Sequence, residues 1–178
     1  YLGSVASTGK QLAAYVDSFR DDPEPVVLVF FGDHKPWLGA GNSFYEELGV
    51  NVQEGTAEGL YHLYTTPYLI WANDAAKAVL GKDFTGTGPT ISPCYLMSVL
   101  FDCCGWDGPS WMQLQRQTHA VLPVMQSRGI YLVAQDGAPS AEKDVASLTY
   151  ALEGDALQAE QNYAIAEYYV RRIRPAKS

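Results

Sequence analysis

The sequence has little positive charge and no long apolar run. Its 178 residues include 12 Lys and Arg against 20 Asp and Glu, a formal net charge of −8. A surface of that sign repels phosphate backbones, so we expect no nucleic-acid partner. No stretch approaches the roughly 20 apolar residues that a membrane-spanning helix requires. With 47% hydrophobic and 18% charged residues, the composition is instead that of a folded globular protein.

Cysteine is also scarce. The three residues Cys94, Cys103 and Cys104 cannot all pair with one another, and their spacing fits no zinc motif of the CxxC type. Cys103 and Cys104 lie in an apolar helical segment, which favours buried free thiols.

Several familiar signatures are missing. We find no G-x-S-x-G elbow, no Walker loop and no Rossmann glycine pattern. The chain also begins without an initiator Met or a signal peptide, since Tyr1-Leu2-Gly3-Ser4 already looks like folded sequence. We therefore expect a single domain over residues 1–178, or the C-terminal part of a larger catalytic domain.

The apolar segments predict an α/β fold. Residues 26–31, Val-Val-Leu-Val-Phe-Phe, are apolar on both faces, which is typical of a central parallel strand covered by helices on each side. A preceding helix, capped by Ser7 or Thr8 and ended at 21–23, is predicted by apolar residues at helical spacing: Leu12, Tyr15, Val16 and Phe19. The class expected is a mostly parallel sheet flanked by helices.

Further elements alternate along the chain. In the first half, the predictions are a helical turn at 44–48 within a loop-like excursion (39–59), a strand in 64–74 with its apolar core at 68–71, and a helix at 75–80. In the second half, they are a helix at 94–104 begun by Ser92-Pro93, a helical segment at 111–127 with a kink or break at Pro123 and an end at Gly129, and a strand at 130–135 with a turn at Asp136-Gly137. A long helix closes the chain, with one apolar stripe of Leu152, Ala156, Ala159, Tyr163, Ala166, Val170 and Ile173.

The triplet Gly32-Asp33-His34 is the main candidate site. In open α/β sheets, functional groups collect beyond the carboxyl ends of strands, where this triplet stands. A carboxylate and a neutral imidazole are ordinary ligands for Zn²⁺, Mn²⁺ or iron, and Gly32 allows the sharp bend that aims both at one centre. The alternative is a simple turn, with the His satisfied locally.

Other polar residues give weaker indications. His62 precedes a strand, where it is either a distal ligand or substrate contact or a loop-packing residue. Lys35 and Trp37 follow the triplet directly and are candidate substrate-binding residues. His119 falls within a predicted helix, where a solvent-facing or locally bonded side chain is the expectation.

Three segments together resemble a known family. "VVLVFFGDHKPWLG", "YTTPYLIWAND" and "ISPCYLMSVLFDCCGW" follow one another in the order found in the C-terminal part of lipoteichoic acid synthase-like sulfatases, of the alkaline phosphatase superfamily. The resemblance covers roughly residues 1–135 and leaves 140–178, the long C-terminal helix, unmatched. It implies the C-terminal portion of an alkaline phosphatase-like sandwich.

The family's chemistry is metal-dependent group transfer. The resemblance implies a divalent metal (Mn²⁺, with Zn²⁺ or Mg²⁺ as alternatives), with Asp33 and His34 as ligands, and a Thr nucleophile that takes phosphoglycerol from phosphatidylglycerol. The Thr nucleophile and the remaining ligand lie, in the family, before the position of Tyr1. No catalytic residue is therefore expected in this chain, which should be inactive by itself.

The resemblance also implies location and partners. Such enzymes act on lipid head groups or cell-envelope polymers at the extracellular face of the bacterial membrane, held there by N-terminal membrane helices. A phosphatase or sulfatase of the same superfamily is one alternative. The other is a non-catalytic module that binds wall glycans or a partner through Trp37, Trp106 and Trp111. A homo-oligomer is also expected of the isolated chain, because a two-faced apolar strand leaves exposed edges.

Overall fold

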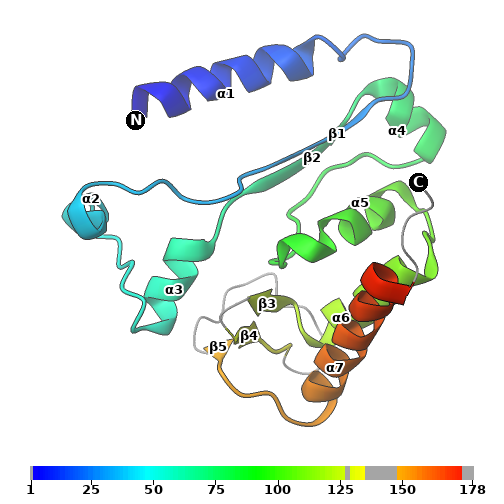
Figure 1. Ribbon diagram of the computed structural model, residues 1–178. Coiled ribbons are helices and arrows are strands. Elements are labelled where there is room, and N and C mark those ends of the chain that lie inside the picture. The colour runs from blue at the N-terminus through cyan, green and yellow to red at the C-terminus, as the bar shows by residue number, and fades with distance from the viewer. Residues whose placement is uncertain (1, 127–128, 135–147, 174–178) are drawn as a thin grey trace.

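The chain folds into short helices and two small sheets (Figure 1). The structure, a computed structural model, describes residues 2–126, 129–134 and 148–173. The elements in chain order are α1 (Leu2–Asp17), β1 (Val27–Phe31), η1 (Ala40–Asn42), α2 (Ser43–Glu47), α3 (Ala57–Tyr64), β2 (Tyr68–Ala72), α4 (Asp74–Leu80), η2 (Pro93–Tyr95), α5 (Leu96–Cys104), α6 (Ser110–Val121), β3 (Val124–Gln126), β4 (Ile130–Leu132), β5 (Leu148–Thr149), α7 (Gly154–Tyr168) and the π-helical turn η4 (Tyr169–Ile173).

The mixed α/β class is confirmed, but the strands pair differently from the prediction. β1 and β2 form an antiparallel ribbon, and β3, β4 and β5 form a separate antiparallel sheet. No parallel pair occurs among the described strands. β1 was predicted to be a central parallel strand, but its one described neighbour, β2, is antiparallel to it. The last ladder pair is Phe31 opposite Tyr68, and one step further the Gly32 nitrogen donates to the Pro67 carbonyl. The chain therefore leaves β1 and enters β2 at the same end of the ribbon.

The β1–β2 ribbon is only partly covered. Its register places Val27 opposite Ala72 and Phe31 opposite Tyr68. Val27, Leu28 and Val29 are half-buried, whereas Phe30 and Phe31 are exposed. An apolar strand with this much exposed surface has room for another element on its faces or its free edge.

Helix α1 lies along one face of this ribbon (Figure 1). It begins at Leu2, so the prediction that Ser7 or Thr8 caps it was wrong: both lie inside the helix. Leu12, Val16 and Phe19 are half-buried, as their spacing predicts, although Tyr15 stays exposed. The helix ends at Asp17, ahead of the predicted stop.

Between β1 and β2 the chain makes a small lobe. The predicted turn at 44–48 is α2, one residue earlier, but α3 was not predicted. Thr56 caps α3 by accepting a hydrogen bond from the Gly59 nitrogen at 3.0 Å. We did not predict this helix because its sequence contains Gly59, and Gly is a poor helix former.

Helices α5, α6 and α7 form the larger packed body. Ser92 and Pro93 begin it as predicted, and Gly105 ends α5 in the left-handed conformation (φ 73°). The Ser92 hydroxyl caps no helix, however; it exchanges hydrogen bonds with the backbone of Met125. Arg116 of α6 donates to the Asp102 carboxylate at 2.5 Å and to the Trp106 carbonyl at 2.6 Å, and so closes the C-terminal end of α5.

The segment after α6 corrects one prediction. The break at Pro123 is confirmed, but residues 124–126 form strand β3 and do not continue the helix. β3 pairs with β4 across the turn at Gly129. Backbone pairing with a strand a few residues ahead therefore overrides the helical propensity of this segment. Of the predicted strand 130–135, β4 occupies 130–132, and the turn at Asp136-Gly137 lies outside the described residues.

The C-terminal helix is confirmed as α7, which begins after Glu153 and passes into η4. The predicted stripe faces the body: Ala156 is buried, and Leu152, Ala159, Tyr163 and Ala166 are half-buried. The Tyr163 ring packs on Trp111 of α6 and on Tyr95. Val170, beyond α7, is exposed. No helix in the described part of the chain is long and apolar enough to cross a membrane.

The body contains a half-buried imidazole with a buried, unsatisfied nitrogen. The His119 Nε2 atom is buried without a hydrogen-bond partner among the described residues, and its ring lies 5.3 Å from that of Tyr95. Burial lowers the pKa of His119, against a smaller opposing effect of Asp102. The interior therefore favours the neutral ring. Of the two expectations for His119, a solvent-facing or a locally bonded side chain, the first is not met, because the Nε2 atom is buried.

This arrangement predicts a pH dependence of stability. The unfolded chain takes up the proton first as the pH falls below about 6.5, so His119 lowers the free energy of unfolding from there downward and not above it. His119→Phe keeps a ring against Tyr95 and removes the titration. Urea unfolding at neutral and mildly acidic pH should show wild type losing more stability than the variant. Equal losses would contradict the assignment.

Candidate functional site

The segment Gly32-Asp33-His34 leaves the end of β1 and faces solvent. The side chains of Asp33 and His34 are 80% and 77% exposed. Gly32 continues the ribbon by one step, since its nitrogen donates to the Pro67 carbonyl at 3.0 Å. The two candidate ligands therefore begin where the ladder between β1 and β2 ends.

One atom of each candidate ligand is held by the backbone. The Asp33 Oδ1 atom accepts a hydrogen bond from the His34 nitrogen at 2.9 Å. The His34 Nδ1 atom lies 3.0 Å from the Lys35 carbonyl. Because a carbonyl oxygen can only accept, this contact places the ring proton of the neutral imidazole on Nδ1 and leaves the Nε2 lone pair free.

The two remaining atoms face each other. His34 Nε2 lies 3.4 Å from Asp33 Oδ2. Two ligands of a tetrahedral Zn²⁺ stand about 3.4 Å apart, given metal–ligand distances of about 2.1 Å. Around an octahedral ion with similar distances the separation is about 3 Å. An Nδ1–H bonded to a backbone carbonyl is also the usual support of a metal-ligating His. The pair thus fits two adjacent positions on one divalent metal.

Two ligands do not complete a metal site. Within the described ranges no group of three or more His, Cys, Asp or Glu side chains comes close enough to hold a metal ion. The cysteines add nothing here, because all three thiols are free and burial raises the pKa of each. Cys104 is buried and Cys103 half-buried, in keeping with the prediction of free buried thiols.

Lys35 turns away from the pair and toward α3. Its ammonium group donates to the backbone carbonyl of His62, in the last turn of that helix. A cation at this end of a helix interacts favourably with the helix dipole. Burial lowers the pKa of Lys35. The residue predicted to contact substrate therefore anchors the loop after His34 to α3.

The other two substrate-binding candidates, His62 and Trp37, have different environments. The His62 ring sits at the end of α3, with Nδ1 2.9 Å from the Asn51 carbonyl, and so fastens the lobe internally. Trp37 is 73% exposed. No described contact brings either ring to Asp33 or His34.

The three Trp residues proposed for a binding module differ in environment. Trp106 packs edge-on against Phe101 at 5.2 Å, and Trp111 packs on Tyr163 at 5.0 Å. Two of them thus have ring partners within the body, although Trp106 remains 46% exposed, and Trp37 is the most exposed of the three.

Two further residues connect the ends of the ribbon, and the sequence did not single them out. Thr66 donates its hydroxyl hydrogen to the Gly32 carbonyl at 2.7 Å. At the other end the Asn73 side chain accepts from the Val26 nitrogen at 3.0 Å. Both belong to the "TTPYLIWAN" segment, so the signal was present in the motif, but the partners lie 34 and 47 positions away.

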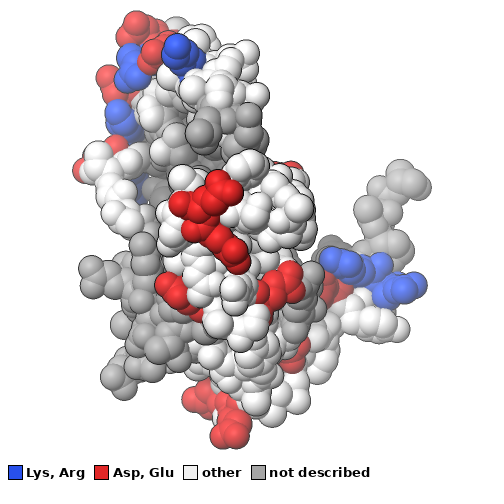
Figure 2. All heavy atoms as spheres, turned by 90° about the vertical axis from the view of Figure 1, so that its left-hand side faces the viewer, with Lys and Arg blue, Asp and Glu red and all other residues white. Residues whose placement is uncertain are grey.

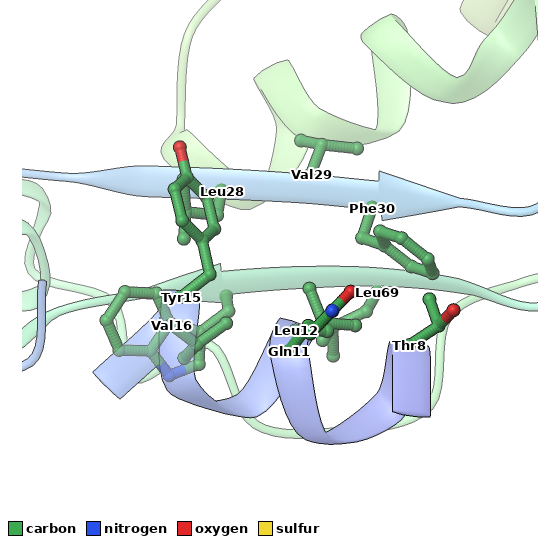
Figure 3. Close-up of a pocket in the computed structure, with 10 residues that line it drawn as sticks. Thr8, Gln11, Leu12, Tyr15, Val16, Leu28, Val29, Phe30 and Leu69 are labelled. Carbon is green, nitrogen blue, oxygen red and sulfur yellow. The ribbon is translucent and has the colours of Figure 1, made fainter. Parts of the chain in front are cut away.

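A cavity of about 340 Å³ opens between α1 and the ribbon. Figure 3 shows Leu28 and Phe30 pointing toward α1, where Leu12 and Val16 point back, with Val29 on the opposite side of the strand. Thr8 and Gln11 supply its few polar atoms. The cavity reflects the light packing of α1 on the ribbon and is not shared with Asp33 or His34.

The end of the molecule that carries α2 and α3 is acidic. Figure 2 shows acidic side chains spread over this face, with basic ones at its margins. The exposed carboxylates of this lobe are Glu46, Glu47, Glu54 and Glu58, and no Lys or Arg occurs between Lys35 and Lys77. An acidic face of this kind repels a phosphate backbone.

Comparisons of the chain with protein-family models, with curated proteins and with solved structures gave no match.

Proposed function

We propose that this chain is the C-terminal part of the catalytic domain of a metal-dependent phosphoglycerol or phosphoethanolamine transferase. The observation that carries the proposal is the facing pair of His34 Nε2 and Asp33 Oδ2 at the end of β1, 3.4 Å apart. A simple turn accounts for the contacts of Asp33 Oδ1 and His34 Nδ1. Without a metal the other two atoms form at most an exposed ion pair, of little energetic value, when the imidazole is protonated.

Asp33 and His34 would hold a divalent metal, with Mn²⁺ first and Zn²⁺ or Mg²⁺ as alternatives. Such a metal stabilises negative charge on phosphoryl oxygens. The chain's own part is to present one carboxylate oxygen and one imidazole nitrogen in fixed relation, with the ring proton held on Nδ1 by the Lys35 carbonyl. The third ligand and the Thr nucleophile are assigned to sequence upstream of Tyr1.

The free edge of β1 supports the proposal that the rest of the catalytic domain lies upstream of this chain. In the described residues β1 pairs with β2 alone, and Phe30 and Phe31 remain exposed. An antiparallel edge strand on an otherwise parallel sheet is common in large α/β folds. We assign the parallel partner of β1, and with it the remainder of an alkaline phosphatase-like sandwich, to the upstream part. In the isolated chain we expect a second copy to take this edge.

The proposed setting is the extracellular face of a bacterial membrane, with a phospholipid head group or cell-envelope polymer as substrate. The same pair of ligands serves a phosphatase or sulfatase equally well, so the acceptor and the ester are decided by upstream residues. The exposed aromatic rings of Trp37 and, in part, Trp106 favour a non-catalytic glycan- or partner-binding module.

A transfer assay tests the proposal. The reading frame extended upstream of Tyr1 should release diacylglycerol from phosphatidylglycerol when Mn²⁺ is present, and His34→Ala or Asp33→Asn should lower the rate by about 100-fold or more. His62→Ala is the matched control and should retain most of the rate. It removes a ring that bonds to the Asn51 carbonyl and leaves the backbone carbonyl that accepts from Lys35. The 178-residue chain alone should show no turnover above its His34→Ala variant.

Three results would overturn this account. One is turnover by the chain alone, and another is full activity of the extended His34→Ala protein. The third is hydrolysis of sulfate esters with no action on phosphodiesters, which would identify the protein as a sulfatase.

A further inference from the structure

The ribbon ends beside Asp33 with an incomplete pair of backbone hydrogen bonds. In an antiparallel ladder, residues of a hydrogen-bonded pair exchange two N–H···O bonds. The register places Gly32 opposite Pro67, and the Gly32 nitrogen does donate to the Pro67 carbonyl at 3.0 Å. Proline has no N–H, so the second bond of the pair, to the Gly32 carbonyl, cannot come from the backbone.

The Thr66 hydroxyl supplies the missing donor. It lies 2.7 Å from the Gly32 carbonyl oxygen and replaces the N–H that Pro67 lacks. The contact is also sterically close, since a Cβ added at Gly32 would lie 3.0 Å from the Thr66 Cβ. Gly32 is therefore the residue that lets Thr66 approach this carbonyl.

This hydrogen bond determines the direction in which the backbone continues from Gly32 to Asp33. The Gly32 carbonyl and the Asp33 nitrogen belong to one planar peptide unit. When the carbonyl is held, the plane of that unit is held, and with it the direction in which Asp33 and then His34 leave the strand. Gly32 has no side chain to restrict its own backbone, so without the Thr66 contact this peptide has freedom to rotate.

We propose that Thr66 is a positioning residue for the Asp33–His34 metal pair, acting through the Gly32 peptide. The inference rests on the proposed function, because it takes the pair to be metal ligands. Thr66 contacts neither ligand's side chain in the described hydrogen bonds, and its role is to keep Oδ2 and Nε2 within reach of one ion. Supporting contacts of this kind typically change metal affinity by about 10- to 100-fold.

The neighbouring Thr65 provides the matched control. Its hydroxyl donates to the Tyr61 carbonyl inside α3 and not to Gly32. Thr65→Val and Thr66→Val therefore each remove one hydroxyl group. The first loses the hydrogen bond to the Tyr61 carbonyl and the second the bond to the Gly32 carbonyl. Thr66→Ser restores the hydroxyl without the methyl group.

The test is a Mn²⁺ titration followed by NMR. It is made on the chain, which should bind weakly through two ligands alone, and on the protein extended upstream of Tyr1, which should supply the third ligand. Each variant is first checked for an unchanged unfolding midpoint, and the paramagnetic broadening of the His34 ring signals is then compared with that of His62 and His119. In wild type, Thr65→Val and Thr66→Ser, the His34 signals should broaden first. In Thr66→Val the Mn²⁺ concentration needed should rise about tenfold, and the amide shifts of Asp33 and His34 in the metal-free protein should move.

The outcomes separate this inference from the proposed function. If neither the wild-type chain nor the protein extended upstream of Tyr1 shows selective broadening at His34, the metal pair itself is wrong. If wild type binds at His34 and Thr66→Val binds equally well, the pair stands and Thr66 has no positioning role. If Thr66→Val loses stability, Thr66→Ser decides: restored stability without restored affinity contradicts the inference.

Discussion

Replacing Asn73 by Ala is expected to lower the free energy of unfolding by about 3–5 kcal/mol. The Asn73 side chain is 1% exposed and joins three parts of the chain. Its oxygen accepts from the Val26 and Ala76 nitrogens at 3.0 and 2.9 Å. Its amide group donates to carbonyls of the turn after α1, which are those of Phe19, Asp22 and Glu24 at 3.2, 3.1 and 2.8 Å.

The cost is large because the partners stay buried when the amide is removed. An unsatisfied buried donor or acceptor costs about 1–3 kcal/mol. Asn73→Asp should be at least as damaging as Ala, since it directs a carboxylate at three carbonyl oxygens. Urea unfolding measures both variants against Asn162→Ala, whose side chain is exposed on α7 and bonds only to Gln158. A change within about 1 kcal/mol for Asn73→Ala would contradict this role.

Replacing Gly59 by Ala should separate α3 from the turn before it. A Cβ at position 59 would lie 2.0 Å from the Gln53 carbonyl oxygen and 2.6 Å from the Gln53 nitrogen. Both are backbone atoms, so no side chain can move aside. We expect a loss of about 3 kcal/mol or more and rapid hydrogen exchange of the α3 amides.

Gly55→Ala is the control in the same turn. No atom lies within 4 Å of a Cβ built at Gly55, and its φ is not positive. Its stability should stay within about 1 kcal/mol of wild type, with a gain as the favoured sign. If Gly55→Ala and Gly59→Ala behaved alike, the close packing of α3 on Gln53 would be wrong.

The sequence predicted elements whose signals are local. Ser92-Pro93 and Gly105 bracket the segment of η2 and α5 because a proline at the first helical position and a glycine beyond the last are properties of neighbouring residues. The α7 stripe was likewise visible, since one periodic run decides which face is buried. Strand 124–126 was missed because its partner β4, and not its own composition, makes it a strand.

The site divides in the same way. Asp33 and His34 stand next to each other, so their shared exposure at the end of β1 follows from the sequence. The roles of Thr66 and Asn73 do not, because each depends on a backbone partner in the other strand. Once the register is known, Pro67 explains the Thr66 contact. Because proline has no N–H, the Gly32 carbonyl needs a donor from another residue.

The antiparallel ribbon was the main departure. Apolar residues on both faces of β1 indicated a strand with neighbours on either side, and among the described strands it has one. Periodicity reports how much surface a strand can bury, and it carries no information on the direction of its partner. The proposed upstream strand would reconcile the two.

The most direct measurement of the central claim is the wild-type arm of the Mn²⁺ titration. The chain contains only three His residues, so His34, His62 and His119 serve as probes of one another in a single spectrum. The account predicts that the His34 ring signals broaden first and that Asp33→Asn abolishes the preference. In the protein extended upstream of Tyr1, which supplies the third ligand, equal broadening of His34 and His62, or a preference for His34 that survives in Asp33→Asn, would contradict a shared metal site.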